Sequence, residues 1–294
     1  MSAFQEELDS RDTLYLVDGE SPTLVEAWTI AVVSPERRHY WSYYKEPGVM
    51  TRYMPVWSEE ELLDAQKGMY THLEEELVKT LYEKWAGSAL YCLQWAKNVD
   101  SQRELQRVVD AIDLGAWSSL GNIEDMSAPS SRICPFSVSD DYSSAEVVFA
   151  SRYVERLVMS AFMRRRPTEL MQELASWMGE EARALFVEAA FEEMFHNAME
   201  GGCRLECRDL ETKDAEPFTQ HFEKCVTHMF LNKEDVRSNV AANYLIPTLR
   251  TFAAVAILQP NSLFQVTTAE SHKVLDTGLD AALQLLPKSS EYKL

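Results

Sequence analysis

The sequence is short of positive charge. Its 294 residues include 28 Lys and Arg against 47 Asp and Glu, which gives a formal net charge of −19. Nucleic acid is a polyanion, and binding it requires clustered Lys and Arg that displace counterions. The charge balance therefore argues against a nucleic-acid-binding protein of the simplest kind, and also against an electrostatic anchor to anionic lipid.

Long apolar runs are also missing. No run of about 18 apolar residues occurs, the length needed to cross a bilayer, so we expect no membrane contact. The first nine residues are acidic and lack the basic start and apolar stretch of a signal peptide. The apolar content of 46% is that of a folded protein, and we expect a soluble chain.

Two catalytic signatures are absent. The dipeptide Gly-Lys occurs nowhere, so there is no Gly-x-x-x-x-Gly-Lys-Ser/Thr loop to hold the phosphates of a nucleotide. This absence argues against ATP hydrolysis by the chain alone. The Gly-x-Ser-x-Gly nucleophile turn of the α/β-hydrolases is missing too.

Cysteine is scarce and odd in number. The five residues are Cys92, Cys134, Cys203, Cys207 and Cys225. Such a set makes no disulfide framework, and we interpret it as reduced thiols in a reducing compartment. Cys203, Cys207, Cys225 and His228 have zinc-ligand chemistry. A strand over 203–207 would separate its two sulfurs by about 13 Å, whereas helical or turn geometry would bring them together.

Two short apolar runs predict buried strands near the N-terminus. Thr13–Val17 ends at Asp18-Gly19, and Thr29–Val33 ends at Ser34-Pro35. Continuous apolar strands are typical of an α/β sheet covered on both faces. ATPases use an Asp in the position of Asp18 to hold Mg²⁺, but Asp-Gly is also a common turn, which is the favoured interpretation.

Helical periodicity follows. Ser58 and Glu61 match a capping box, and apolar residues then recur from Leu62 to Trp85. Gly68 weakens this helix internally and could mark a break in it, and Gly87-Ser88 is expected to end it.

The apolar pattern fades in the middle of the chain. We therefore predict a linker over 101–145 between domains of residues 1–100 and 146–294. The expected elements of the second half are helices over 146–166, 168–178 and 180–200, strands over 251–258 and 263–267, and a helix over 276–286.

Two side-chain patterns suggest chemistry. Glu192 and His196 stand four residues apart on the third predicted helix and so share a face. They could hold a metal or move a proton, although a local carboxylate–imidazole contact is the favoured interpretation. Arg164-Arg165-Arg166 is interpreted as a solvated helix end, with a phosphate contact as the alternative.

Several of these motifs, in this order, resemble a known family. They are Leu14–Gly19, Val32–Pro35, Tyr53–Leu62, Phe149–Ser151, Phe191–Gly202 and Phe264–Thr267, followed by His272 and Gly278-Leu279. The first three resemble the second half of the ATPase module of Crinkler and retrotransposon-hot-spot proteins. The others resemble the module that follows it, which is similar to restriction-endonuclease-like nucleases.

The resemblance implies an α/β chain with a partial P-loop-type ATPase sheet and helical lid over 1–100, then a restriction-endonuclease-like domain over 146–294. It also implies a modular effector that is secreted and acts in a host cell, often in the nucleus, with a protein partner. Without the family, the lack of an export signal leaves the cytoplasm as the alternative. Nucleic acid is a partner by resemblance only, since the net charge disfavours it.

Position by position, the resemblance implies a catalytic site in which several of the family's residues are replaced. Asp18 matches the Walker-B-type acid that binds Mg²⁺ beside a nucleotide. Glu192 matches the helix carboxylate of the nuclease fold, while Gln265 and Thr267 occupy positions where an active enzyme has Glu and Lys. Ala256 replaces an Asp. Mg²⁺ prefers several oxygen ligands, so one carboxylate and one amide predict weak binding.

These departures favour a catalytically weak or inactive family member, a pseudoenzyme that acts by binding. One alternative is a metal-dependent nuclease in which Glu192 and Gln265 bind the metal. In that case Asp276 or Glu270 would substitute for the acid missing at Ala256.

A second alternative is a regulatory half-module that pairs with a complete ATPase. It would present Asp18 or Arg52 across the interface. A partial sheet has an open edge, which favours such pairing.

Overall fold

The structure is a computed structural model of the chain. It describes residues 4–34, 37–112, 132–179, 184–208, 216–230, 243–248, 255–258 and 262–266. Contacts group the chain into unit 1, residues 1–56 and 110–149, and unit 2, residues 57–109 and 150–294. This grouping differs from the predicted domains, because α4 (Glu75–Trp85) packs with α8 (Arg152–Arg165).

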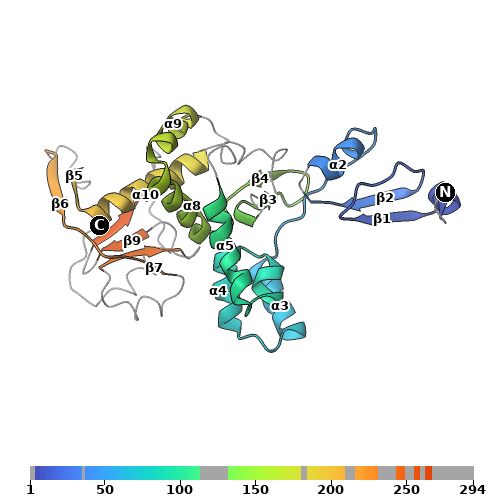
Figure 1. Cartoon of the computed structure of the whole chain (residues 1–294), viewed down its shortest axis with the longest axis horizontal. Coiled ribbons are helices and arrows are strands. Elements are labelled where there is room, and N and C mark those ends of the chain that lie inside the picture. The colour runs from blue at the N-terminus through green and yellow to red at the C-terminus, as the bar shows by residue number, and fades with distance from the viewer. Residues whose placement is uncertain are drawn as a thin grey trace. The chain divides into compact units, whose positions relative to one another are not determined.

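Unit 1 contains two small sheets (Figure 1). Its elements are α1 (Gln5–Leu8), β1 (Leu14–Asp18), β2 (Trp28–Val32), α2 (Arg37–Tyr44), β3 (Phe136–Val138) and β4 (Ala145–Val147). β1 and β2 are parallel, and β3 and β4 are antiparallel. The ring of Tyr53 packs edge-on against Phe136, with centroids 5.6 Å apart, and Tyr53 N donates to Tyr142 O at 2.9 Å.

The two predicted N-terminal strands are confirmed, but the prediction that both faces of their sheet are covered is wrong. Along each strand the side chains alternate between exposed and more buried positions. Leu14, Leu16 and Ile30 on the open side are all more than half exposed. An uninterrupted apolar run does not reveal whether a covering layer belongs to the same chain.

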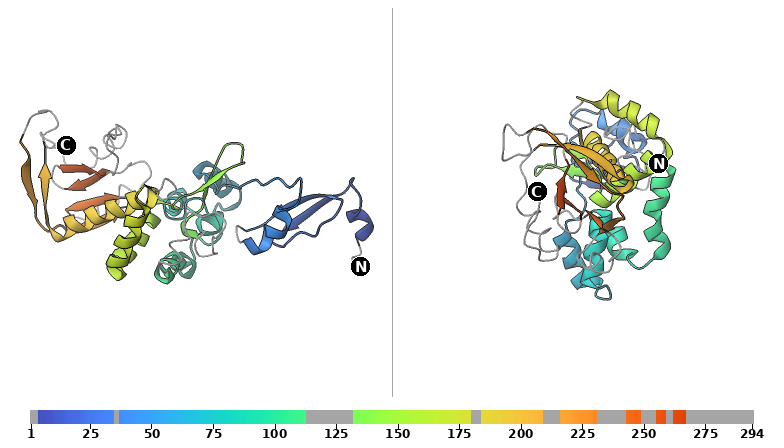
Figure 2. Two further views of the ribbon diagram at one scale, coloured as in Figure 1. Left: turned by 90° about the horizontal axis from the view of Figure 1, so that it is seen from above. Right: turned by 90° about the vertical axis from the view of Figure 1, so that its left-hand side faces the viewer.

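Within the described residues, unit 2 has its helices first and its strands after them (Figures 1 and 2). Its helices are α3 (Glu59–Met69), α4 (Glu75–Trp85), the π-helix η1 (Leu90–Gln94), α5 (Val99–Ala111), α8 (Arg152–Arg165), α9 (Pro167–Trp177) and α10 (Ala184–Gly201). Its strands are β5 (Cys203–Cys207), β6 (Phe218–Phe222), β7 (Thr227–Phe230), β8 (Tyr244–Pro247), β9 (Val255–Leu258) and β10 (Ser262–Gln265).

The capping box at the start of α3 is confirmed. Glu61 N donates to Ser58 Oγ at 3.2 Å, and Ser58 N donates to Glu61 Oε2 at 2.8 Å. The helix expected up to Trp85 is divided in two near Gly68, where the sequence allowed a break: α3 ends at Met69 and α4 begins at Glu75. The buried Gln66 side chain bridges the break by donating to Leu73 O at 2.7 Å.

The end of α4 depends on Gly87. Its φ is +85°, and an added Cβ would lie 1.9 Å from the carbonyl oxygen of Trp57. Trp57 N also donates to Gly87 O at 3.1 Å. Only glycine combines this backbone conformation with so close an approach.

The other helix predictions of unit 2 are confirmed with changed bounds. α8 begins at Arg152 rather than at residue 146, because Ser151 caps it and β4 occupies the preceding residues. α9 starts with Pro167, a residue suited to the first helical turn. α10 closes at Gly201, and Gly202 follows with φ +81°. The helix expected over 276–286 lies outside the described residues.

The strands of unit 2 form one mixed sheet and one hairpin-like pair. The order of the mixed sheet is β10-β9-β8-β7, in which only β7 and β8 are parallel. Its core is an apolar cluster of Met199, Cys225, Tyr244 and Ile246, with Phe195, Cys203, Phe222, Met229 and Phe264 packed around it. The chain is thus broadly α/β, as predicted at that level.

Candidate functional site

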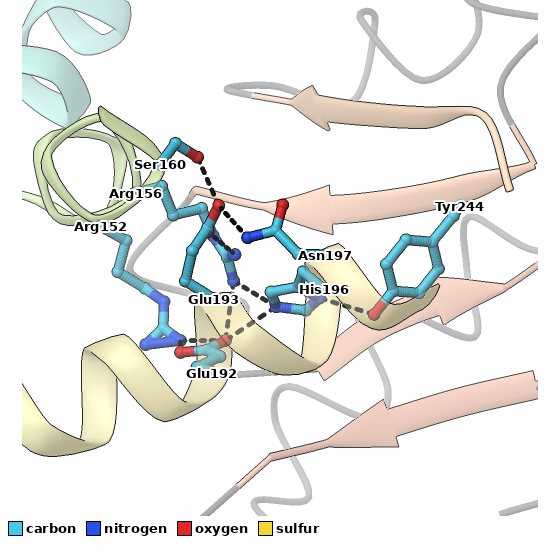
Figure 3. A network of polar contacts seen from close by, with 8 residues as sticks. All are labelled: Arg152, Arg156, Ser160, Glu192, Glu193, His196, Asn197 and Tyr244. Atoms are coloured by element: carbon cyan, nitrogen blue, oxygen red, sulfur yellow. Dashed lines mark hydrogen bonds and ion pairs between the residues drawn. The ribbon is translucent and has the colours of Figure 1, made fainter. Parts of the chain in front are cut away.

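Three elements of unit 2 bring polar side chains together around a buried centre of Arg156, Glu192, Glu193 and His196 (Figure 3). α8 provides Arg152, Arg156 and Ser160, α10 provides Glu192, Glu193, His196 and Asn197, and β8 provides Tyr244. Residues four apart share one face of a helix, so each helix turns a line of polar side chains toward the other. We name this set the Arg–Glu–His network.

Ser151 fixes the position of the first arginine. Its Oγ accepts a hydrogen bond from Val154 N at 3.2 Å, as an N-cap does, and donates one to Lys84 O at 3.2 Å. The start of α8 is therefore tied to α4. Arg152 is the next residue and the first of α8, so this contact fixes the position of its backbone.

The centre of the network is Glu192 between two guanidinium groups. Arg152 Nη2 donates to Glu192 Oε1 at 2.9 Å and to Oε2 at 2.8 Å, and Arg156 Nη2 donates to Oε1 at 2.7 Å. Glu192 is 5% exposed and Arg156 is 3% exposed. Both carboxylate oxygens are thus engaged by cations in a site shielded from water.

These neighbours keep Glu192 ionised. Burial alone would raise the pKa of its carboxyl, but the positive charges of Arg156 and Arg152 oppose burial and hold that pKa below its ordinary value. Glu192 is therefore an anion over the physiological pH range, and the two arginines neutralise it.

His196 links this ion pair to the sheet. Its Nε2 lies 2.8 Å from Arg156 Nη2, and its Nδ1 lies 2.6 Å from the Tyr244 hydroxyl. Burial, helped by the charge of Arg156, lowers the pKa of His196 to about 4, so the ring is neutral. A guanidinium can only donate, so Nε2 accepts from Arg156 and Nδ1–H donates to Tyr244.

Two further carboxyl groups flank the centre. Glu193 accepts a hydrogen bond from Ser160 and one from Asn197, and Arg156 Nη1 lies 3.7 Å from its Oε2. Burial raises the pKa of Glu193. Burial also raises the pKa of Glu155, on α8, to about 7, against the opposing charge of Arg152.

The arginines are not fully satisfied. Arg152 Nε and Arg156 Nε are buried and have no hydrogen-bond partner among the described residues. An unmade bond of this kind costs about 1–3 kcal/mol. The network therefore fixes the relative position of α8 and α10 at some cost in stability.

The residues around Glu192 do not fit a divalent metal ion. Mg²⁺ needs several free oxygen ligands, but both oxygens of Glu192 lie within 3 Å of guanidinium nitrogens. In the part of the chain that the structure describes, no three His, Cys, Asp or Glu side chains are grouped to hold a metal. A cation next to Arg152 and Arg156 would be repelled.

Gln265 points away from this network. Phe264, its neighbour on β10, packs against Phe195 of α10 with ring centroids 5.6 Å apart. Successive side chains of a strand face opposite sides, so Gln265 faces away from Phe195. Ala256 is paired with Phe264 in the register of β9 and β10. Thr267, together with Glu270 and Asp276, lies outside the described residues.

Asp18 belongs to unit 1. It is exposed at the end of β1, opposite Val32 in the register, and Gly19 follows it with φ +73°. Gly19 N donates to Val32 O at 2.8 Å. Gly19 lies in a bend that directly follows β1.

The cysteines suggest structure rather than metal binding. Residues 203–207 form β5, the geometry that separates Cys203 from Cys207. Cys203 and Cys225 instead pack in the apolar cluster around Met199. Burial raises the pKa of both thiols.

Sequence reasoning found Glu192 and His196 but missed most of their partners. The spacing of Arg152 and Arg156 was an available signal, since two arginines four apart share a helix face. Tyr244 gave no signal, because it joins the network only through the fold.

No family model, curated protein or solved structure matches this chain. No helix within the described ranges is long and apolar enough to cross a membrane. The geometry of the network is that of a buried carboxylate held by two guanidinium groups.

Proposed function

We propose that this chain is a Crinkler-like effector, or a remnant of one, whose nuclease-like domain is catalytically weak or inactive. It acts by binding another protein, inside a host cell after secretion. The proposal includes a partial P-loop-type sheet before the nuclease-like domain, with Asp18 at the Walker-B-type position.

One observation gives the main support for the proposed loss of catalysis. The carboxylate of Glu192, which matches the helix acid of the nuclease family, is bonded to Arg152 and Arg156. Cleavage of a phosphodiester with a metal requires carboxylates that are free to bind that metal. A carboxylate held by two guanidinium groups instead stabilises the packing of two helices.

The sequence supports the same conclusion at other positions. Ala256 and Gln265 stand where an active family member would have acids, and Gln265 faces away from Phe195 of α10. The net charge of −19 slows the capture of a polyanionic substrate. Binding to a protein requires neither metal-binding acids nor the capture of a polyanion.

A nuclease assay tests the proposal. The full chain is incubated with single- and double-stranded DNA and with RNA, in the presence of Mg²⁺ or Mn²⁺. We expect no cleavage above that of a Glu192→Gln variant prepared in the same way. Metal-dependent turnover that disappears in Glu192→Gln would show a working nuclease and overturn the proposal.

The variant needs its own control. Glu200→Gln changes an exposed glutamate of the same helix and should retain whatever activity the wild-type chain has. Circular dichroism of both variants shows whether a lost activity reflects lost fold.

A further inference from the structure

The β1–β2 sheet of unit 1 has one apolar side. The strands are parallel, and their register pairs Leu14 with Trp28, Leu16 with Ile30 and Asp18 with Val32. Paired residues of neighbouring strands point to the same side of a sheet. We name this side the apolar face; it consists of Leu14, Leu16, Asp18, Trp28, Ile30 and Val32.

The apolar face is open, while the opposite side is not. Trp28 is 72% exposed and Leu16 is 66% exposed. On the other side, Val17 is buried and Tyr15 is half-buried. α2 follows these strands and is tied to the segment between them, since Ser21 Oγ donates to His39 O at 3.0 Å.

A parallel sheet with one bare face is incomplete. In α/β proteins both faces of a parallel sheet are covered by helices, because its strands are apolar on both sides. A contiguous apolar surface rimmed by polar residues marks an interaction site. A helix is therefore the element expected to cover this face, whereas strands added to the same sheet would extend its edges.

The charged residues of 4–34 indicate which charge a helix bound to this face would carry. Residues 4–34 contain exposed acids at Glu6, Glu7, Asp9, Asp12, Asp18, Glu20 and Glu26. Their one basic residue, Arg11, already pairs with Glu26 at 3.2 Å. Charge complementarity therefore favours a basic partner, and it disfavours a second copy of a chain with net charge −19.

We propose that the apolar face binds an amphipathic, basic helix of a partner protein. The apolar stripe of that helix packs on Trp28, Leu16 and Ile30, and its flanking Lys and Arg side chains pair with Asp18 on the face and with the other exposed acids of residues 4–34. This inference rests on the proposed function, because it names the surface through which the chain binds another protein.

A designed peptide tests the inference on the full chain. The probe is a fluorescein-labelled synthetic helix with Leu along one face and Lys on the other, measured by fluorescence anisotropy. One comparison peptide has Glu in place of Lys, and another has the same composition in scrambled order. We expect the Leu/Lys helix to bind, the Leu/Glu helix not to bind, and the scrambled peptide to bind at least about tenfold more weakly.

Variants of the apolar face locate the binding. Ile30→Asp and Leu16→Asp each place a carboxylate where the helix would exclude water, so each should weaken binding at least about tenfold. Both side chains are exposed, so the fold should survive, and circular dichroism checks that it does. The matched control is Met178→Asp in unit 2, a residue that is 74% exposed, and it should leave affinity unchanged.

Several outcomes would overturn the inference. They are absence of binding, equal binding of the scrambled peptide, or an equal loss of affinity in Met178→Asp. Sedimentation that detects a dimer abolished by Ile30→Asp would assign the face to a second copy instead. Nuclease turnover lost in Glu192→Gln would refute the proposed function alone, whereas failed peptide binding without such turnover would refute only this inference.

Discussion

His196 Nδ1 donates a hydrogen bond to the Tyr244 hydroxyl, at 2.6 Å, because its other ring nitrogen accepts from Arg156. With Nε2 in this role, the 3.4 Å contact between Nε2 and Glu192 joins two acceptors and is not a hydrogen bond. Arg156 therefore sets the tautomer of the histidine, and the histidine in turn ties α10 to β8.

Tyr244→Phe should destabilise the protein by about 1–3 kcal/mol, because it leaves the buried Nδ1–H of His196 without an acceptor. Urea unfolding measures the change. Tyr142→Phe, at an exposed tyrosine, is the matched control and should have little effect. Equal stability of Tyr244→Phe and wild type would contradict the assigned tautomer.

Glu192→Ala should cost about 3–5 kcal/mol of unfolding free energy, since it leaves two guanidinium groups near one another without their anion. Glu200→Ala removes an exposed glutamate from the same helix and should cost less than about 0.5 kcal/mol. Chemical denaturation of the two variants gives the comparison. If the two costs were similar, Glu192 would not hold α8 and α10 together.

Stability should depend on pH through two opposing groups. The pKa of His196 is about 4 in the fold against an ordinary 6.5, so the unfolded chain binds more protons and stability rises as pH increases through this range. The pKa of Glu155 is about 7 against an ordinary 4.5, so its contribution is lost as pH increases. The two effects oppose each other between pH 4.5 and 6.5.

The substitution Glu155→Gln removes the contribution of Glu155 and leaves that of His196. Its stability should rise more steeply than that of wild type between pH 4.5 and 6.5, measured by thermal unfolding at a series of pH values. Glu200→Gln should retain the wild-type profile. A Glu155→Gln profile parallel to wild type would show that Glu155 does not titrate in this range.

Gly87→Ala should destabilise by more than about 1 kcal/mol, since alanine disfavours positive φ and its Cβ would collide with Trp57 O. Gly68→Ala, within α3 and with open space around it, should instead stabilise by up to about 1 kcal/mol. Melting temperatures that shift in opposite directions would confirm the assignment. A neutral Gly87→Ala would contradict the close approach of Trp57.

Local signals in the sequence were sufficient for local structure. The capping box at Ser58 and the glycine at Gly202 predicted where helices begin and end, because caps depend on neighbouring backbone groups. β1 and β2 were found from their apolar residues. What covers those residues is a tertiary property, so the exposure of Trp28 could not be predicted from the run itself.

The candidate site was only half predictable for the same reason. The spacing of Glu192 and His196 indicated a shared helix face, but Arg156 lies 36 residues before Glu192 and contacts it through packing of α8 on α10. The identity of the groups opposite a carboxylate decides whether it binds a metal or a guanidinium. That identity depends on the fold.

The central claim is that Glu192 is a structural anion and not a metal ligand. Its most direct test is Mn²⁺ titration of the wild-type chain, monitored by NMR of the histidine imidazoles, since a paramagnetic ion on Glu192 would broaden the signals of His196. The exposed His221 reports loose binding of Mn²⁺ to the acidic surface. We predict that the His196 signals persist at Mn²⁺ concentrations that broaden those of His221, and selective early loss of the His196 signals would contradict the claim.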